Sequence, residues 1–334
     1  MKGITMNTVI YDPASRINLL EYGIEVPLLD SRTGQLLNQI RKSLHQLELV
    51  EIDFPSFTPE ELLLVHDHAW VDWLCNHPDK AAWLTWELRA ADGSWHRYDP
   101  EKAARPLSDL IETTIRMASG TWVGAQTALE KGFSYVLGGG FHHAMAHGGA
   151  GFCLVNDIAL TIAKLRQDKP QARCWVIDVD VHKGDGTAQI TQHDPMTGTL
   201  SIHMADGWPL DLPEDDPTRL SSRVPSTVDI PLKAGDEDIY QEKLQEGLIK
   251  LKSALPNPDL VIVVAGSDPY EKDALPSANG INMSREQLLE RDLWLYDTFA
   301  KWELPQTWVM AGGYGEFAWE IHSAFLEALN KRGL

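Results

Sequence analysis

Carboxylates and an imidazole alternate along one short apolar segment of the chain. The segment reads Asp178-Val179-Asp180-Val181-His182. Side chains two residues apart in an extended segment point the same way, so Asp178, Asp180 and His182 share one face. Charged groups that follow a buried run need a partner, and a metal ion can serve as one. The spacing therefore predicts a metal site here, with a structural hydrogen-bond network as the alternative.

A third carboxylate follows another apolar segment. Asp268 comes shortly after residues 260–264, which read Leu-Val-Ile-Val-Val. A catalytic zinc site typically has three protein ligands and one position open to water. Asp180, His182 and Asp268 are therefore the candidate ligand set. Taken alone, Asp268 beside Pro269 is more typical of a turn or helix cap.

An adjacent histidine pair, His142-His143, follows a glycine-rich turn at residues 138–141. The backbone freedom of glycine lets both imidazoles approach a common ligand. One of them can act as a general base, and Asp178 and Asp185 are carboxylates that can orient the two rings. A single histidine is usually structural, whereas a pair beside a metal is usually catalytic.

Tyr314 stands in a glycine-rich turn after the apolar run at residues 307–310. A phenol hydroxyl in a dry site can donate a hydrogen bond to a developing oxyanion. The alternative is a tyrosine of the hydrophobic core. The preceding glycines favour the catalytic interpretation, because they bring the ring close to the site.

Alternating apolar runs and amphipathic stretches predict the elements that position these groups. The pattern is typical of βαβ units with a parallel sheet, so we expect an α/β fold. Strands are expected at 8–11, 133–137, 174–179, 199–202, 260–264 and 307–310, and helices at about 108–130, 156–167, 236–254, 284–301 and 316–330. The carboxyl ends of parallel strands lie along one edge, so the four polar clusters can converge there.

The remaining segments indicate a single domain over residues 1–334, because the sequence contains no repeat or interdomain linker. Residues 209–225 are rich in Pro and Asp and predict one long loop. Residues 77–106 hold Trp83, Trp86 and Trp95 among charges and prolines. We expect a surface excursion there, either a structural cap or a lid over the site.

Net charge, cysteine content and the length of the apolar runs argue against several classes of partner and site. Lys and Arg number 29 against 48 Asp and Glu, a net charge of −19, so we expect no nucleic-acid partner. The cysteines, Cys75, Cys153 and Cys174, offer neither a disulfide framework nor a CxxC site, which fits a reducing compartment. No apolar run reaches membrane-spanning length. The sequence predicts a cytoplasmic protein without a membrane partner.

Four segments together resemble the histone deacetylase superfamily, which includes acetylpolyamine amidohydrolases. They read Leu-Gly-Gly-Gly-Phe-His-His-Ala at 137–144, Gly-Ala-Gly-Phe-Cys-Leu-Val-Asn-Asp-Ile at 149–158, Val-Ile-Asp-Val-Asp-Val-His-Lys-Gly-Asp-Gly at 176–186 and Ala-Gly-Gly-Tyr at 311–314. The resemblance extends over about residues 57–320. The Gly-Phe-His-His, Ala-Gly-Ser-Asp and Ala-Gly-Gly-Tyr segments look closest to the class IV branch.

The resemblance implies an arginase–deacetylase α/β fold, with a central, mainly parallel sheet and helices on both faces. It implies Zn²⁺, or Fe²⁺ as the alternative, on Asp180, His182 and Asp268. The implied roles are His143 as general base, His142 as its electrostatic partner, Tyr314 as the carbonyl-polarising donor, and Asp178 and Asp185 as orienting groups. Gly151, Phe152 and Leu275 would line the substrate channel. A structural K⁺ near Asp178, Asp180, His182 and Ser201 is also typical of the family.

The resemblance implies removal of acetyl or longer acyl groups from lysine side chains of peptides or proteins. An acetylpolyamine deacetylase is the first alternative. The second is a catalytically silent module that binds acylated lysine, although the expected ligands, His pair and Tyr314 are all present. A binuclear manganese ureohydrolase would need an acid at position 184, where the chain has Gly184.

Overall fold

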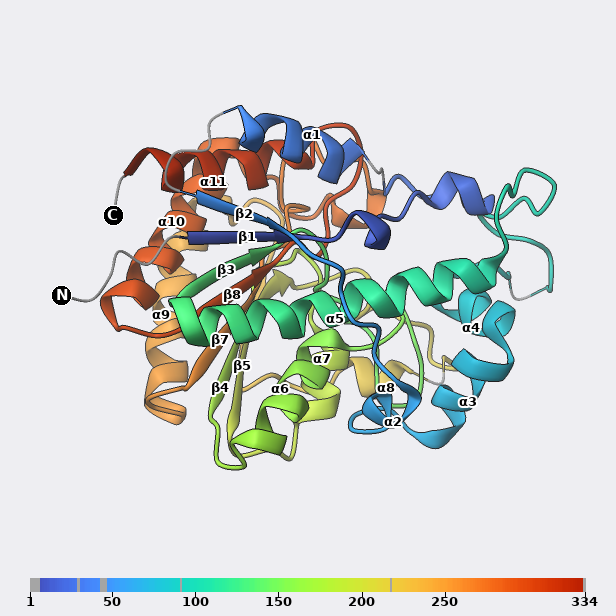
Figure 1. Ribbon diagram of the computed structural model, residues 1–334, viewed down its shortest axis with the longest axis horizontal. Coiled ribbons are helices and arrows are strands. Elements are labelled where there is room, and N and C mark those ends of the chain that lie inside the picture. Colours follow the sequence, from blue (N-terminus) through green and yellow to red (C-terminus); the bar gives the residue numbers. More distant parts are fainter. Residues whose placement is uncertain (1–6, 29–30, 43–46, 91, 217, 333–334) are drawn as a thin grey trace.

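Eight parallel strands form one sheet in a computed structural model, which describes residues 7–28, 31–42, 47–90, 92–216 and 218–332 (Figure 1). The strand order across the sheet is β2-β1-β3-β8-β7-β4-β5-β6. In chain order the strands are β1 (Asn7–Tyr11), β2 (Leu47–Glu51), β3 (Phe133–Val136), β4 (Cys174–Asp178), β5 (Thr197–Met204), β6 (Val228–Leu232), β7 (Leu260–Val264) and β8 (Gln306–Val309). Every neighbouring pair is parallel.

Helices cover both faces of this sheet (Figure 1). The described residues form α1 (Ser31–Arg41), α2 (Pro59–Leu62), α3 (His68–Asn76), α4 (Pro78–Thr85), α5 (Leu107–Lys131), α6 (Asp157–Asp168), α7 (Asp185–Thr191), α8 (Arg219–Ser222), α9 (Tyr240–Ala254), α10 (Arg285–Lys301) and α11 (Trp319–Arg332). Helices α5 and α6 pack on one face, and α9, α10 and α11 pack on the other. The predicted α/β class with a helix-covered parallel sheet is confirmed.

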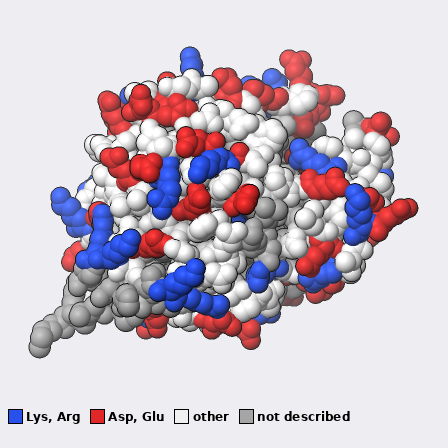
Figure 2. Space-filling view, turned by 90° about the horizontal axis from the view of Figure 1, so that it is seen from above, with Lys and Arg blue, Asp and Glu red and all other residues white. Residues whose placement is uncertain are grey.

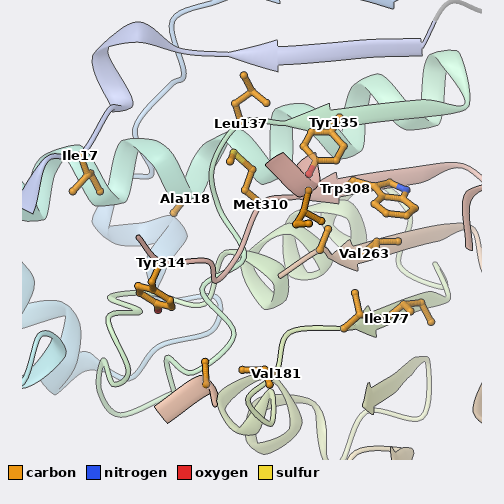
Figure 3. Close-up of a cluster of buried hydrophobic side chains, with 14 of the residues drawn as sticks. Ile17, Ala118, Tyr135, Leu137, Ile177, Val181, Val263, Trp308, Met310 and Tyr314 are labelled. Atoms are coloured by element: carbon orange, nitrogen blue, oxygen red, sulfur yellow. The ribbon is translucent and has the colours of Figure 1, made fainter. Parts of the chain in front are cut away.

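Alternate residues of the central strands enter two separate apolar layers. Tyr135 and Trp308 belong to one layer, in which Trp308 stacks on Phe325 of α11 with 4.6 Å between ring centroids. Val136 and Val309 belong to the other layer, beneath α5. Burial of both faces is why these strands are near-continuous hydrophobic runs. Figure 3 shows the first layer extending from the sheet toward Tyr314, beyond the strand ends.

The six expected strands are present, but two further strands escaped prediction. Both β2 and β6 lie at the edges of the sheet. In β2 only the first residue, Leu47, is buried, and in β6 buried residues alternate with more exposed ones. Strand β6 also contains Pro231, which is tolerated in an edge strand. The expected helices are present with small shifts at their ends. The largest shift is at the expected 236–254, where a 3-10 turn precedes α9.

Four adjacent strands deliver the four polar clusters to one edge of the sheet. In the sheet order these strands are β3, β8, β7 and β4. The histidine pair follows β3, Tyr314 follows β8, Asp268 follows β7, and Asp180 and His182 follow β4. The topology thus explains why groups up to 172 positions apart, from His142 to Tyr314, can meet.

The surface carries acidic and basic side chains interspersed over the face drawn in Figure 2. No helix of the described residues is long and apolar enough to cross a membrane. Among the described residues of the expected long loop at 209–225, the short helix α8 is the one regular element. In the expected excursion at 77–106, Trp86 is buried, whereas Trp95 is 39% exposed.

Candidate active site

Two carboxylates and one imidazole meet beyond β4 and β7. One ligand atom from each of Asp180, His182 and Asp268 lies within 4.8 Å of the others, and all three side chains are buried. The Nδ1 of His182 lies 3.3 Å from Asp180 Oδ1 and 3.3 Å from Asp268 Oδ2. Asp268 Oδ2 has no hydrogen-bond partner. An unpartnered buried carboxylate oxygen beside a second carboxylate and an imidazole nitrogen fits a divalent metal ion.

Backbone N–H groups hold the two carboxylates in place. Asp180 Oδ2 accepts a hydrogen bond from Gly312 N–H at 2.9 Å, and Asp268 Oδ1 accepts one from Val181 N–H at 3.0 Å. A β-carbon at Gly312 would lie 2.4 Å from both Asp180 Oδ2 and Asp268 Oδ2. Only glycine therefore lets the turn after β8 approach the ligand set so closely.

The histidine pair lies beside this ligand set, with 3.9 Å between the two ring centroids. His142 Nδ1 lies 2.7 Å from Asp178 Oδ2, and His143 Nδ1 lies 2.7 Å from Asp185 Oδ1. The structure thus brings together both predicted histidine–carboxylate pairs. His142, His143 and Asp180 form a second group with metal-ligand spacing. The two groups share Asp180, and the Nδ1 atoms of His142 and His143 already contact carboxylates. Together the two groups therefore fit one ion and not two.

The two histidines differ in their electrostatic surroundings. Burial on its own lowers the pKa of His142, but the charges of Asp178 and Asp180 outweigh burial and raise the pKa to about 9. Burial, together with the positive charge of His142, holds the pKa of His143 well below its usual range. These surroundings favour the protonated form of His142 and the neutral form of His143. Environments that separate two neighbouring pKa values in this way are typical of acid–base catalysis.

Tyr314 faces the same space from the turn after β8. Its backbone N–H donates to Asp273 Oδ2 at 2.7 Å, and its ring lies 6.0 Å from that of Phe152. The residue is 9% exposed and also packs against the core. Burial, reinforced by the charges of Asp180 and Asp268, raises the pKa of the phenol well above its usual value. The hydroxyl consequently stays protonated and can donate a hydrogen bond.

A sequence model of the histone deacetylase domain matches residues 27–328. The chain belongs to the histone deacetylase domain family. It is 34% identical over 208 residues to an uncharacterized protein of Picosynechococcus, and 28% identical over 219 residues to histone deacetylase 2 of Arabidopsis thaliana. These matches cover 62% and 66% of this chain, and 64% and 54% of the two relatives. The chain thus spans less than two thirds of either relative's length.

Two solved structures share the fold of this histone deacetylase family member. Acetylpolyamine aminohydrolase from Burkholderia pseudomallei superposes with a TM-score of 0.71 at 18% identity, over 97% of this chain and 99% of the other. The HDA15 HD domain has a TM-score of 0.71 at 20% identity, over 98% and 90% of the two chains. The expected arginase–deacetylase architecture is confirmed. The class IV-like branch stays a prediction.

A cavity of about 140 Å³ connects the candidate site to the surface. His143, His182 and Tyr314 line its inner end. The three residues expected to line a substrate channel, Gly151, Phe152 and Leu275, are all on its wall. The predicted channel residues therefore lie around the same cavity as His143, His182 and Tyr314.

Sequence reasoning missed three residues of the site. Trp208 forms a wall of the cavity, with its ring 4.5 Å from that of His143. Arg32 Nη1 donates to the carbonyls of Ala311 at 2.7 Å and Gly313 at 3.3 Å. Asp273 accepts from the N–H groups of Tyr314 and Leu275. A tryptophan beside an otherwise polar loop was a usable signal for Trp208, whereas nothing in the local sequence marks Arg32 or Asp273.

Two of the residues predicted to lie near a potassium ion, Asp178 and Ser201, are neighbours in the sheet. Asp178 and Ser201 are register partners on the neighbouring strands β4 and β5. Ser201 Oγ accepts a long hydrogen bond, 3.4 Å, from Gly184 N–H. The presence of K⁺ beside these residues stays a prediction.

Proposed function

We propose that this chain is a metal-dependent deacylase that hydrolyses the amide of acyl-lysine side chains in peptides or proteins. The proposal includes Zn²⁺ as the metal, with Fe²⁺ as the alternative, and a structural K⁺. It also treats residues 1–334 as one deacetylase domain in the cytoplasm. Membership of a family of hydrolytic deacetylases supports the reaction class.

One observation carries the proposal: the candidate metal ligand His182, the neutral His143 and the hydroxyl donor Tyr314 all line the same cavity. Each group alone has a structural explanation. Their convergence on one buried space that opens to the surface is the arrangement that amide hydrolysis needs. The catalytically silent alternative would not require all three.

The chemistry assigns a distinct task to each group. A divalent ion held by Asp180, His182 and Asp268 supplies Lewis-acid polarisation and an activated water near neutral pH. His143 has Nδ1 committed to Asp185, so Nε2 is the nitrogen that takes the proton of the attacking water. Tyr314 donates its hydroxyl to the amide oxygen as negative charge develops there. The proton then passes to the amine nitrogen as the carbon–nitrogen bond breaks.

The substrate proposal is tested with purified, metal-loaded protein and a panel of amides. The panel contains acetyl-lysine peptides, longer acyl-lysine peptides, and acetylated putrescine and spermidine. We expect the highest kcat/KM for an acyl-lysine peptide. A kcat/KM for either polyamine at least tenfold above every peptide, about 1.4 kcal/mol in transition-state binding, would establish the polyamine alternative instead. Metal binding without hydrolysis of any member would favour the silent binding module.

A further inference from the structure

The mouth of the cavity is built by a β-hairpin from the excursion at 77–106. Within this hairpin Arg89 and Trp95 form an antiparallel bridge, and His96 N–H donates to Leu88 O at 3.0 Å. Glu87 and Arg97, which flank the bridge, both line the cavity that ends at His143 and Tyr314. The excursion therefore contributes side chains to the candidate site as well as covering it.

Glu87 and Arg97 form an ion pair at this mouth. Arg97 Nη1 donates to Glu87 Oε2 at 3.2 Å. The Arg97 side chain is 36% exposed and the Glu87 side chain is 38% exposed. Both residues have a φ of +54°, a backbone conformation that is costly for residues other than glycine. Backbone contacts hold them there: Arg97 O accepts from Glu25 N–H at 2.8 Å, and Glu87 O lies 3.0 Å from His96 Nδ1.

The ion pair leaves the guanidinium with unused donors. Arginine has five N–H donors, and among the described residues Glu87 is the acceptor that contacts them. The guanidinium also lies over Phe152, 5.9 Å from the ring centroid, on the wall of the channel. Glu87 is the one acid among the described residues that line this cavity, and Arg97 already neutralises it.

These charges discriminate between the two substrate classes. In acyl-lysine and in acetylpolyamines a similar run of methylene groups separates the amide nitrogen from the next polar group. In lysine the methylene run ends at the α-carbon, which carries a carbonyl or carboxylate whose oxygens accept hydrogen bonds. In a polyamine the run ends at an ammonium group. A guanidinium with unused donors can bind the first, whereas the ammonium finds no unpaired acid among the described residues that line this cavity.

We propose that Arg97, held by Glu87, is a specificity residue that binds a carboxylate or peptide carbonyl oxygen on the α-carbon side of an acyl-lysine substrate. The inference rests on the proposed deacylase function. Arg97 acts on the part of the substrate outside the channel, so it contributes to binding and not to the reacting atoms. Its removal should raise KM and leave kcat nearly unchanged.

The test compares Arg97→Gln with wild type on four amides. They are an internal acetyl-lysine peptide, Nα,Nε-diacetyl-lysine with a free carboxylate, N-butylacetamide without any α-carbon oxygen, and acetylputrescine. We expect kcat/KM to fall about tenfold on the lysine substrates, through KM, because a hydrogen bond to a charged group is lost. N-butylacetamide should be unaffected. A fall on both lysine compounds indicates a peptide carbonyl as acceptor, and a fall on the free acid alone indicates a carboxylate.

Three further variants sharpen the result. Arg97→Lys retains the charge and should recover part of the lost affinity, whereas Arg97→Glu should increase kcat/KM for acetylputrescine. Arg89→Gln is the matched control on the same hairpin, because the Arg89 guanidinium stacks 3.3 Å from the Trp95 ring centroid and does not line the cavity. Thermal unfolding of each variant checks the fold.

Equal effects of Arg97→Gln on the lysine substrates and on N-butylacetamide would overturn the role of Arg97, while the deacylase function would stand. A wild-type protein that hydrolyses none of the lysine substrates would overturn the proposed function and this inference with it.

Discussion

The α-carbon of Gly151 faces the edge of the Trp208 indole so closely that a β-carbon there would lie 2.2 Å from the ring. The same β-carbon would lie 2.7 Å from His143 Cδ2, and Gly151 has a φ of +52°. A side chain at position 151 would therefore displace Trp208 or His143, and glycine lets both rings keep their positions beside the cavity.

Gly151→Ala should lower kcat/KM by about tenfold or more, because Trp208 or His143 must move and transition-state stabilisation is sensitive to such misplacement. Gly93→Ala is the control: Gly93 has a φ of +82°, but nothing lies within 4 Å of an added β-carbon. That variant should lose only stability, about 1 kcal/mol. Steady-state kinetics of both variants decide the matter, and full activity of Gly151→Ala would contradict the crowding argument.

His143→Ala should lower kcat by about 10²–10⁴-fold, the usual contribution of a general base. The metal content should stay at the wild-type level, because Asp180, His182 and Asp268 form a ligand set without His143. His147→Ala, an exposed histidine of the same loop, is the matched control. If His143→Ala lost the metal along with the activity, the assignment of His143 as a base would fail.

Tyr314→Phe should reduce kcat by about 10²–10³-fold, since it removes one donor to the developing oxyanion. KM should change less. Tyr270→Phe provides the comparison, because the Tyr270 hydroxyl donates to Glu320 Oε2 at 2.8 Å and does not line the cavity. A wild-type rate for Tyr314→Phe would leave Tyr314 as a core residue only.

The fold class and the clustering of the candidate site residues were predictable because the patterns that indicate them are local in the sequence. The apolar run of β4 and the alternating Asp180 and His182 after it are contiguous in the sequence, so a period-two pattern suffices. The strand order that places β3, β8, β7 and β4 side by side is not encoded in any one segment. Parallel sheets nevertheless bring all carboxyl ends to one edge, so convergence could be expected without the order.

The missed residues share a physical reason. Arg32, Trp208 and Asp273 reach the site from segments whose positions depend on tertiary packing, and the same is true of Arg97. Arg32 spans 279 positions to the carbonyl of Ala311. The pairing of Glu87 with Arg97 depends on a hairpin whose two left-handed residues have no glycine signal. Edge strands such as β6 were missed because partial exposure mixes polar residues and a proline into their pattern.

His66 predicts a pH dependence of stability that is separate from catalysis. The imidazole is buried, its Nδ1 lies 3.0 Å from Met145 O, and its Nε2 accepts from Asn156 N–H at 3.0 Å. These contacts require the neutral ring, and burial lowers the pKa from 6.5 to about 4. Between pH 4 and pH 6.5 the imidazole of His66 therefore binds more protons in the unfolded chain than in the folded one. The contribution to stability is complete above pH 6.5 and is lost as pH falls toward 4, by about 3 kcal/mol.

Urea unfolding at several pH values between 4.5 and 7 checks this expectation. The free energy of unfolding should rise with pH in wild type and rise less steeply in His66→Gln, which cannot titrate. If the free energy of unfolding had the same slope against pH in both proteins, folding would not lower the pKa of His66.

A metal titration tests the central claim most directly. The protein is stripped with a chelator and reloaded stepwise with Zn²⁺, while acyl release from an acyl-lysine peptide and bound metal are measured together, alongside Asp268→Ala. Activity should be lost on stripping, return in proportion to bound metal and level off at one ion per chain, and Asp268→Ala should remain inactive and largely metal-free. Full activity of the stripped protein, or a requirement for two tightly bound ions, would contradict a single-metal deacylase site on Asp180, His182 and Asp268.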